Sequence, residues 1–503
     1  MVALSLLVAV SSCSWVLDFP DVGSGTGATS GGTTTTGAGG GPCDPGTTVA
    51  PPPELVWHGT SPNGNDSDSV HVSGLARVGD ELDVWGTNFN GIQNFPNLSP
   101  GAANIVYLLS FKDSGPVDVI GYGTACTSLN GYFTTGRMGL LNGRPLVSFV
   151  VPTANPPSMA AFGLGTADPC ATGTMFYPKS ASTPVNAYFS ATTVSLEDAG
   201  DGLGSSIDVA ANAKGDAAGL QVLRGSAWGN TAPDELTFWY YMLRSDASSS
   251  SQGLLMTEIA NEAQVGGAFV PYGGVAVDDG GGVWSTGMAC AAPGNCTGAA
   301  FVSSWPAGEG TTETHVTVNS PNASFGSVIR YAGGRVVVGG AYVGSFAVGG
   351  AALPAASDTD QFVAAIDPAT RQALWTYPTT TELARPAFDA VVDVAAVGTP
   401  GCGAVYVLAC GADPTSATQD CLGLDNGKRA FLTKLDLGTG AQVWTTEIAT
   451  EAPTDNYIVP RAVAADDTGV WAAFSYRGTV NVGGTAIVSN NLSVDTLILK
   501  FAR

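Results

Sequence analysis

Positively charged residues are scarce in this sequence. Lysine and arginine together number 19, against 42 aspartates and glutamates, and the formal net charge is −23. Charged residues of either sign make up 12% of the chain, about half of the roughly one quarter that is usual for globular proteins. An acidic surface repels phosphate groups and anionic lipids. The composition therefore argues against a nucleic-acid partner and against membrane binding through a basic surface.

Residues and motifs that carry catalysis are scarce as well. Histidine occurs three times, at His58, His71 and His315. No H-E-x-x-H, C-x-x-C or closely spaced group of histidine, cysteine and carboxylate supports a zinc or iron site, and neither a G-x-S-x-G elbow nor a phosphate-binding G-x-x-x-x-G-K-S/T loop is present. His71 lies near Asp66 and Asp68, but we expect it to be a solvated loop residue. From these absences we expect no catalytic residue, no metal site, no cofactor and no enzymatic activity.

Two stretches rich in aspartate and asparagine, residues 63–68 and 358–360, could offer oxygen ligands to calcium. They lack the spaced bidentate glutamate of an EF-hand loop. Asx turns on an acidic surface are therefore the simpler interpretation of both.

Long apolar runs are missing too. The run Leu4–Val10 is too short to cross a bilayer and is typical of the apolar region of an export signal. The residues that follow it, Val10-Ser11-Ser12-Cys13, resemble a bacterial lipobox, which implies lipidation of Cys13 as the mature N-terminus. No lysine or arginine precedes the run, and an ordinary cleaved signal is the alternative.

The segment after Cys13 contains almost nothing that could form a core. Residues 23–41 consist only of glycine, serine, threonine and alanine, a composition that behaves as a flexible coil. We therefore expect residues 1–13 to be a signal with its lipidation cysteine, residues 14–53 to be a flexible tether, and residues 54–503 to form the folded body.

Turn-forming residues and strand-forming residues, by contrast, are abundant. With 67 glycines and 30 prolines, and with valine, threonine and aromatics between them, the chain favours many short strands over helices. Two kinds of apolar hairpin alternate along it, and their equivalent points recur every 61 to 69 residues; these points are Tyr107, Phe176, Trp239, Phe301, Phe362, Phe431 and Leu497. Radial packing of such four-stranded units gives a β-propeller, in which neighbouring units cover the faces of each sheet and only short edges are exposed. We predict an all-β, seven-bladed propeller with four antiparallel strands per blade, whose blades start near residues 70, 135, 205, 272, 325, 388 and 460.

The two ends of the folded body complement one another. The last unit stops one strand short, while Glu54-Leu55-Val56-Trp57 stands alone before the first unit and matches the fourth strands that begin at Ala373 and Gln442. We therefore expect the strand at residues 54–60 to complete the last blade by pairing with residues 496–500, which removes an exposed edge. A β-sandwich is the alternative that this end-to-end match disfavours.

Two turns carry a family resemblance. Trp375 and Trp444 end the segments Asp367-PATRQALW and Asp436-LGTGAQVW, which look like the tryptophan repeats of pyrroloquinoline-quinone-type propellers. The continuation through Val463-AADDTGVWAAFSYRG resembles the SBBP-type repeat of secreted bacterial β-propellers. The resemblance implies a propeller fold and export, and it implies little about activity.

Nine cysteines leave eight once Cys13 is assigned to lipid, an even number for a chain exported to an oxidising compartment. In a propeller, the loops between second and third strands and between blades lie on one face, and the hairpin turns lie on the other. Pairing cysteines that share a face predicts four disulfides, with free buried thiols as the alternative: Cys290–Cys296, Cys410–Cys421, Cys126–Cys170 and Cys43–Cys402.

The long loops between second and third strands contain aromatics mixed with asparagine and serine. Rings and amides together suit contacts with sugars or proteins, although each ring could instead fold over its own blade. We take five aromatics as candidates for a binding face: Phe89, Phe95, Trp228, Phe346 and Tyr476.

These observations lead to one interpretation of function with two alternatives. We expect a monomeric, non-enzymatic propeller that binds a protein or glycan of the cell envelope. We expect it to be lipid-anchored at the bacterial outer membrane or cell surface, or secreted, and to contact the membrane only through its lipid. A scaffold for outer-membrane protein assembly is one alternative. A polysaccharide-active enzyme that uses acidic loop residues is the other, and hydrolysis would need paired carboxylates.

Overall fold

The structure is a computed structural model, and its described residues are all strands, turns or irregular segments. They are residues 24–25, 48–60, 69–89, 105–112, 115–123, 134–141, 144–152, 170–176, 192–193, 205–224, 238–245, 255–260, 273–289, 298–307, 313–378, 389–399, 402–412, 421, 427–450, 456–490 and 493–502. Within these ranges no helix is long and apolar enough to cross a membrane.

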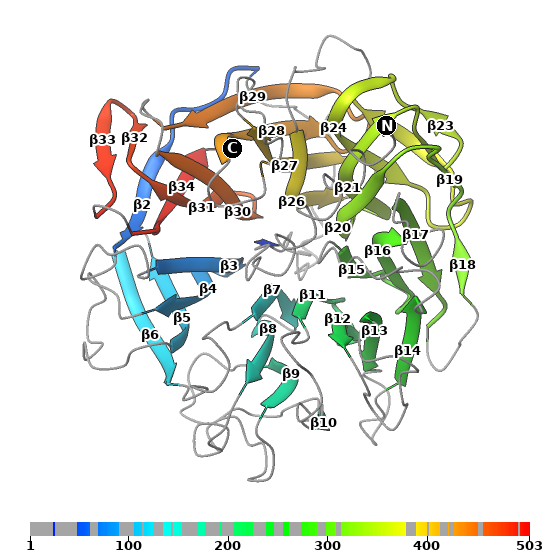
Figure 1. The fold of residues 1–503 in the computed structure, drawn as a ribbon, viewed down its shortest axis with the longest axis horizontal. Coiled ribbons are helices and arrows are strands. Elements are labelled where there is room, and N and C mark those ends of the chain that lie inside the picture. The colour runs from blue at the N-terminus through cyan, green and yellow to red at the C-terminus, as the bar shows by residue number, and fades with distance from the viewer. Residues whose placement is uncertain are drawn as a thin grey trace, which may run out of the picture.

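In the described part of the chain, seven larger sheets radiate from a common centre, and two small sheets flank them (Figure 1). Each larger sheet is antiparallel over its four main strands and is named here by its innermost and outermost strands. The strands, from the centre outward, are β3 (Ser69–Val78), β4 (Glu81–Phe89), β5 (Ile105–Lys112) and β6 (Gly115–Gly123); β7 (Thr134–Leu141), β8 (Arg144–Pro152), β9 (Cys170–Phe176) and β10 (Thr192–Thr193); β11 (Ser205–Ala211), β12 (Ala217–Arg224), β13 (Phe238–Ser245) and β14 (Leu255–Ala260); β15 (Gly273–Val277), β16 (Val283–Ala289), β17 (Ala299–Trp305) and β18 (Thr314–His315); β20 (Ser324–Ala332), β21 (Arg335–Gly344), β24 (Ala356–Ile366) and β25 (Ala373–Tyr377); β26 (Asp389–Thr399), β27 (Cys402–Ala412), β28 (Gly427–Asp436) and β29 (Gln442–Ala449); and β30 (Tyr457–Ala465), β31 (Gly469–Arg477), β34 (Asp495–Ala502) and β2 (Glu54–Gly59). The small sheets are β19 (Val318–Asn319), β22 (Ala347–Val348) and β23 (Ala351–Ala352), and β32 (Thr479–Val482) with β33 (Thr485–Val488). The prediction of an all-β, propeller-type fold is confirmed.

Innermost strands are buried on both faces because each lies between neighbouring sheets. β30 is buried at every position, and so is β15, which explains why these segments are runs of valine, alanine and glycine rather than alternating patterns. Small residues also allow close approach of the backbones. A Cβ atom at Gly274 would lie 2.7 Å from the backbone nitrogen of Ile329 in the neighbouring sheet.

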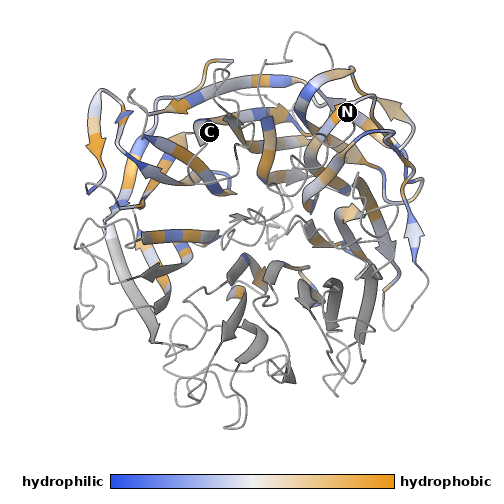
Figure 2. Ribbon diagram, in the orientation of Figure 1, coloured by the Kyte–Doolittle hydropathy of each residue, from blue (hydrophilic) through white to orange (hydrophobic). Residues whose placement is uncertain are grey.

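Hydrophobic side chains fill the spaces between adjacent sheets. One cluster joins the β20–β25 and β26–β29 sheets and includes Trp375, Val391 and Leu435, and another joins the β26–β29 and β30–β2 sheets. Figure 2 shows the corresponding pattern, in which hydrophobic segments alternate with hydrophilic ones along the described strands. Face-to-face burial of this kind is what lets a short sheet persist without an exposed apolar face.

The N-terminal strand β2 belongs to the same sheet as the last strand of the chain. It pairs antiparallel with β34, with Leu55 opposite Leu499 and Trp57 opposite Ile498, and the register shifts at Val56 between them. Another early segment, β1 (Ser24–Gly25), pairs in parallel with β3. These two residues lie in the stretch that the sequence predicts to be a tether, residues 14–53.

Candidate functional site

Most innermost strands share an irregularity that brings polar side chains to the centre. Each of β3, β7, β11, β20, β26 and β30 has a register shift where it pairs with the second strand of its sheet. A bulge adds one residue and redirects the side chains beside it. The shifts fall at Ser73, at Gly136 and Arg137, and at Ile207, Ser327, Val392 and Arg461.

Arg330, on β20, bridges two aspartates from other sheets. Its Nη1 donates to Oδ2 of Asp208 at 2.7 Å, and its Nη2 donates to Oδ1 of Asp393 at 3.1 Å. The three side chains are 6%, 0% and 0% exposed. Burial alone would lower the pKa of Arg330, but the carboxylates of Asp208 and Asp393 raise it above its ordinary value. The guanidinium therefore stays charged and holds both acids together.

Each aspartate also binds the backbone of the next sheet along the chain. Oδ2 of Asp208 accepts the N–H of Val275 at 3.1 Å, and Oδ2 of Asp393 accepts the N–H of Val463 at 2.8 Å. The two aspartates occupy the same position relative to the bulge in β11 and β26. They act as equivalent links between neighbouring sheets.

Arg137 reaches across the centre from β7 to three other sheets. Its Nη2 donates to the carbonyl oxygens of Ser327 at 2.7 Å and of Val392 at 3.0 Å, and its Nη1 lies 3.4 Å from Oδ2 of Asp208. Burial lowers the pKa of Arg137, and the nearby carboxylates, Asp208 first, oppose that effect. Together with Arg330, this side chain makes the centre a buried, compensated ion network that joins several sheets, which is a structural role.

The loop face is the side that carries the connections between second and third strands, such as the hairpin β32–β33 between β31 and β34. Three side chains of the β30–β2 sheet meet near its loop-face end. The hydroxyl of Tyr476 hydrogen-bonds Nε2 of His58, and the same Nε2 lies 3.7 Å from Oδ2 of Asp495. The side chain of His58 is 21% exposed, whereas that of Asp495 is fully buried.

Backbone and hydroxyl donors fix the acid of this cluster. Oδ2 of Asp495 accepts the N–H of Asn490 at 2.7 Å, and its Oδ1 accepts the hydroxyl of Ser493 at 2.9 Å. Burial, and then the Asp495 carboxylate, raises the pKa of Tyr476, so that its hydroxyl keeps its proton. The cluster therefore contains a neutral acid, an imidazole at the surface and an oriented carboxylate, which are the parts of a proton-transfer group.

The sequence did not single out this cluster, because its members come from three strands that are far apart in the chain. The histidines were predicted to do little chemistry, and His71 was predicted to be a solvated loop residue. That prediction is wrong, since His71 lies in β3 and is 3% exposed. Burial, together with the charge of Arg461, lowers the pKa of His71 to about 3.

Two of the five aromatic candidates are core residues. Phe346 is 3% exposed and its ring stacks on Tyr342, with centroids 5.1 Å apart, and Tyr476 is fully buried. The prediction that they present their rings to a ligand is wrong, because each folds over its own sheet. Phe95 and Trp228 lie outside the described residues, and Phe89 ends β4.

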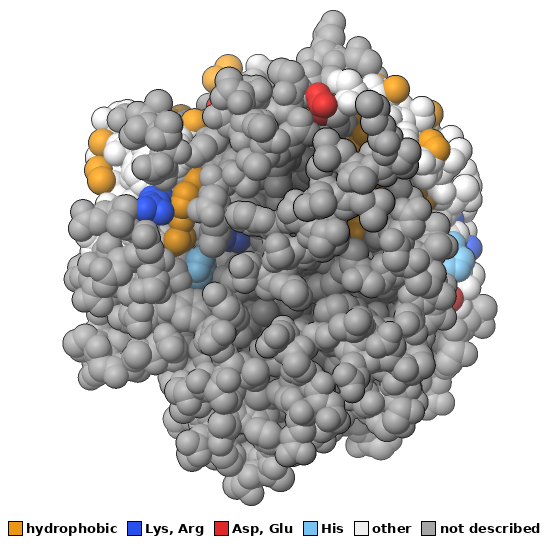
Figure 3. All heavy atoms as spheres, viewed as in Figure 1, with side chains coloured by type: hydrophobic (Ala, Val, Ile, Leu, Met, Phe, Trp, Pro, Cys, Tyr) orange, Lys and Arg blue, Asp and Glu red, His pale blue; other side chains and the backbone are white. Residues whose placement is uncertain are grey.

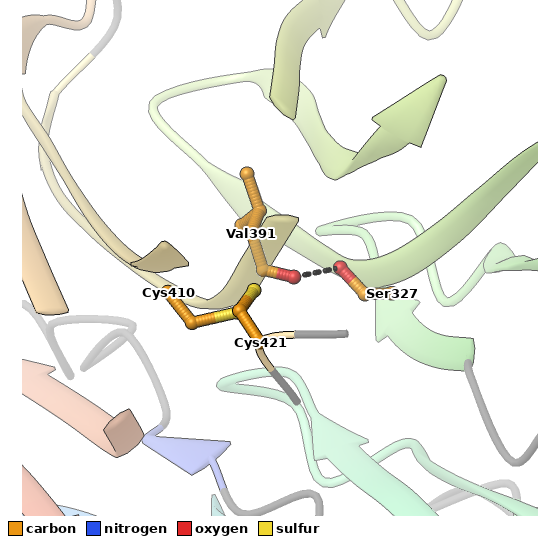
Figure 4. The surroundings of a disulfide bond; sticks show 4 residues. All are labelled: Ser327, Val391, Cys410 and Cys421. Carbon is orange, nitrogen blue, oxygen red and sulfur yellow. Dashed lines mark hydrogen bonds between the residues drawn. A yellow bond between two sulfur atoms is a disulfide. The ribbon is translucent and has the colours of Figure 1, made fainter. Parts of the chain in front are cut away.

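One predicted disulfide is confirmed in the described part of the chain. Cys410 and Cys421 are bonded, with their Cα atoms 5.6 Å apart, and the bond lies close to Val391, whose carbonyl oxygen accepts the Ser327 hydroxyl (Figure 4). Cys402 is also disulfide-bonded. Its predicted partner, Cys43, lies outside the described residues. So do Cys13, Cys126, Cys290 and Cys296, while Cys170 begins β9.

Among the described residues, no group of three histidines, cysteines or carboxylates could hold a metal ion. Asp358 and Asp360 belong to β24 and not to an Asx turn. Residues 63–68 lie outside the described residues. In the view of Figure 3, few charged side chains of either sign are visible among the described residues.

Comparisons with known proteins show similarity to solved structures at the level of the fold. No protein-family model and no curated protein matches the chain. Among solved structures, it is similar to the β-propeller domain of the Trilobed protease from Pyrococcus furiosus (8% identity, TM-score 0.39, 84% of this chain and 95% of that one). It is also similar to the polysaccharide lyase Uly1 (9% identity, TM-score 0.37, 96% of each chain) and to a Trypanosoma rangeli sialidase (9% identity, TM-score 0.38, 86% of this chain and 54% of that one).

These similarities correct one expectation. A sialidase, a lyase and an acylaminoacyl peptidase are among the similar structures, so the conclusion that missing motifs make this chain a non-enzyme is wrong. Identities of 8–10% and TM-scores of 0.35–0.40 carry no argument about which reaction a chain performs. The resemblance to secreted propeller repeats stays a prediction, because no family model matches.

Proposed function

We propose that this chain is an exported β-propeller enzyme that cleaves polysaccharide at its loop face, with His58 as the proton-transfer residue. The observation that carries the proposal is the cluster of His58, Tyr476 and Asp495. A partly exposed imidazole beside a buried hydroxyl and an anchored carboxylate can take a proton from a substrate or give one to it. Groups placed in this way contribute roughly a hundred-fold or more to a reaction rate.

The charge of the chain narrows the substrate class. A net charge of −23 lowers the local concentration of polyanions near the surface. A neutral polysaccharide is therefore the substrate class that the acidic protein disfavours least. Its cleavage is a hydrolysis: the glycosidic C–O bond breaks, His58 gives a proton to the leaving oxygen, and water adds its hydroxyl to the anomeric carbon and returns a proton to His58. The cluster of His58, Tyr476 and Asp495 then takes the place of the two carboxyl groups that most glycoside hydrolases use.

We further infer a seven-bladed ring, spanning residues 54–503, that the N-terminal strand closes. Three features support this inference. The larger sheets follow one another around a centre, β2 pairs with β34, and a hydrogen bond of 2.9 Å from the N–H of Val70 to the carbonyl of Val494 links the last sheet to the first. A ring closed in this way leaves no unpaired inner edge.

The cellular location of the protein is also a proposal. The lipobox-like residues before Cys13 and the glycine-rich stretch at residues 23–41 support a chain that is lipid-anchored at the outer surface of a bacterial cell and held off it by a tether. Incorporation of radiolabelled palmitate tests this location, and we expect the label to be lost in Cys13→Ala.

Polysaccharide cleavage is tested with residues 14–503 on a panel of neutral polysaccharides, by measuring new reducing ends. We expect activity on at least one substrate, and a loss of at least a hundred-fold in kcat for His58→Ala. His315→Ala is the matched control, because His315 is an exposed histidine on the outer strand β18, and it should leave the rate unchanged. No cleavage of any substrate, or equal rates for the two variants, contradicts the proposal.

A further inference from the structure

Three tryptophans occupy the same place on the outermost strands of three sheets. Trp375 pairs with Ala365, Trp444 with Lys434 and Trp57 with Ile498, and in each case the residue just before the tryptophan is skipped by the register. The same one-residue bulge therefore aims each indole in the same direction relative to its sheet.

The contacts of Trp375 show what this position does. Its Nε1 donates to the carbonyl oxygen of Leu437, in a hairpin turn of the next sheet, at 2.9 Å. The ring lies so close to Gly440 of that turn that a Cβ atom there would come within 2.6 Å of it. Gly440 has a φ of 72°, the left-handed region that glycine adopts readily. The turn thus forms a slot for an indole ring.

The preceding pair of sheets has the same turn. In the turn at Asp367, the N–H of Arg371 donates to the carbonyl of Asp367 at 2.8 Å, as that of Gly440 does to Asp436 at 2.8 Å. Arg371 has a φ of 59° and is the one residue other than glycine with a positive φ among the described residues. By this match Arg371 corresponds to Gly440, and Pro368 corresponds to Leu437.

The tryptophan that would fill this slot is replaced by a small residue. Thr314 pairs with Ser304, the residue before the last of β17, as Trp375 pairs with the residue before the last of β24. Thr314 thus stands in the β15–β18 sheet where Trp375 stands in the β20–β25 sheet, and its side chain is far too short to reach over the turn.

A pocket is present at this place. Its volume is about 380 Å³, and its lining includes Trp284, Ser304, Trp305, Thr314, Pro368 and Arg371. Pockets of a few hundred Å³ with aromatic walls and a few polar groups are typical of small-molecule sites. Trp305, one of these lining residues, is almost fully buried, so the wall that it forms is fixed by packing.

We propose that this pocket between the β15–β18 and β20–β25 sheets binds a flat aromatic ring of about the size of indole that carries an N–H donor. The carbonyl of Pro368 stands where the carbonyl of Leu437 accepts the indole N–H of Trp375. Arg371 carries a Cβ where Gly440 has none, so the ring sits further from the turn than Trp375 does. A guanidinium over an aromatic face adds a cation–π attraction. The pocket lies at hairpin turns, on the face opposite the loop face, and it goes beyond the proposed polysaccharide activity.

The test uses the full chain and 5-fluoroindole, with fluorine NMR line broadening as the measure of binding. We expect the wild type to bind the probe and Thr314→Trp/Arg371→Gly to lose at least ten-fold in affinity, because the new indole occupies the slot as Trp375 does. The same double variant should raise Tm. Thr314→Val, which keeps the pocket open, is the matched control and should bind as the wild type does.

A second variant covers the case in which the double variant does not fold. Arg371→Ala keeps the pocket but removes the guanidinium, and we expect it to weaken the probe at least three-fold. N-acetyltryptophanamide serves as a second probe, since its binding would indicate that the site accepts an aromatic residue of a polypeptide as well as a free ring. No binding of fluoroindole to the wild type, or equal affinity in the wild type, the folded double variant and Arg371→Ala, would overturn the proposal.

Discussion

Replacing Arg330 with methionine leaves the carboxylates of Asp208 and Asp393 buried without the guanidinium that bridges them. Both carboxylates are fully buried, and breaking a buried ion pair by removing one partner costs about 3–5 kcal/mol. Arg137 remains 3.4 Å from Asp208 and offsets part of the loss there. Most of the cost should therefore come from Asp393.

Urea unfolding of the wild type and Arg330→Met measures this cost as a change in the free energy of unfolding. Arg330→Met/Asp393→Asn should recover part of it, because the second change removes the carboxylate charge that Arg330 balances in the wild type. Arg429→Met is the matched control, since Arg429 makes an ion pair with Glu447 at 2.6 Å while 34% exposed, and exposed pairs contribute about 0–1 kcal/mol.

The pH dependence gives an independent check. The Arg330 guanidinium lies 3.1 Å from Oδ1 of Asp393, so its removal raises the pKa of that carboxyl relative to the wild type, and the folded variant binds a proton more readily than the folded wild type does. The deficit of Arg330→Met relative to the wild type should be small in acid and grow as the pH rises above about 4. A loss no larger than that of Arg429→Met, or one that is independent of pH, would refute the reasoning that this bridge joins the sheets.

Three further changes test other parts of the molecule. The pKa of His71 is about 3 in the folded state against 6.5 for the free group, so the unfolded state gains a proton as the pH falls below 6.5. The free energy of unfolding should therefore fall by about 2 kcal/mol by pH 5. His71→Gln should remove this pH-dependent loss from the pH profile of urea unfolding. Replacing Cys410 and Cys421 by alanine opens a closed loop of 11 residues and should lower the free energy of unfolding by about 2–3 kcal/mol, while an unchanged value would show that the bond does not restrain the unfolded chain. Trp375→Phe should cost about 1 kcal/mol more than Trp444→Phe in thermal unfolding, because the indole of Trp375 donates a hydrogen bond while that of Trp444 has no partner among the described residues; equal costs would contradict the role of that bond.

Strand content and the order of hairpins could be predicted from the sequence because both depend on local patterns. The apolar hairpins at Val394 and Val463, with tight turns between them, show the strand period directly. The match of Trp57 to Trp375 and Trp444 was also visible in the sequence. The structure places all three after the same bulge, since a one-residue bulge and a tryptophan form a local unit.

Which way the loop aromatics point could not be read in the same manner. Phe346 and Tyr476 stand near loops in the sequence, but the rings that cover Phe346, Tyr342 and Phe362, come from strands of its own sheet. Burial of a ring depends on its three-dimensional neighbours, and a loop position alone does not reveal them.

The sequence by itself determined an acidic, strand-rich chain whose hairpins repeat, because composition and spacing are properties of neighbouring residues. Only the tertiary structure decided where its charges meet. Arg330 is 122 residues from Asp208 and 63 from Asp393 in the sequence. The repeated Asp-Val-Ala-Ala segments at 208–211 and 393–396 indicate that the two aspartates occupy equivalent positions, but they do not show which cation binds them. Sheets that converge on one centre bring such residues within hydrogen-bond distance, and that convergence is a property of the assembled ring of strands and not of any one segment.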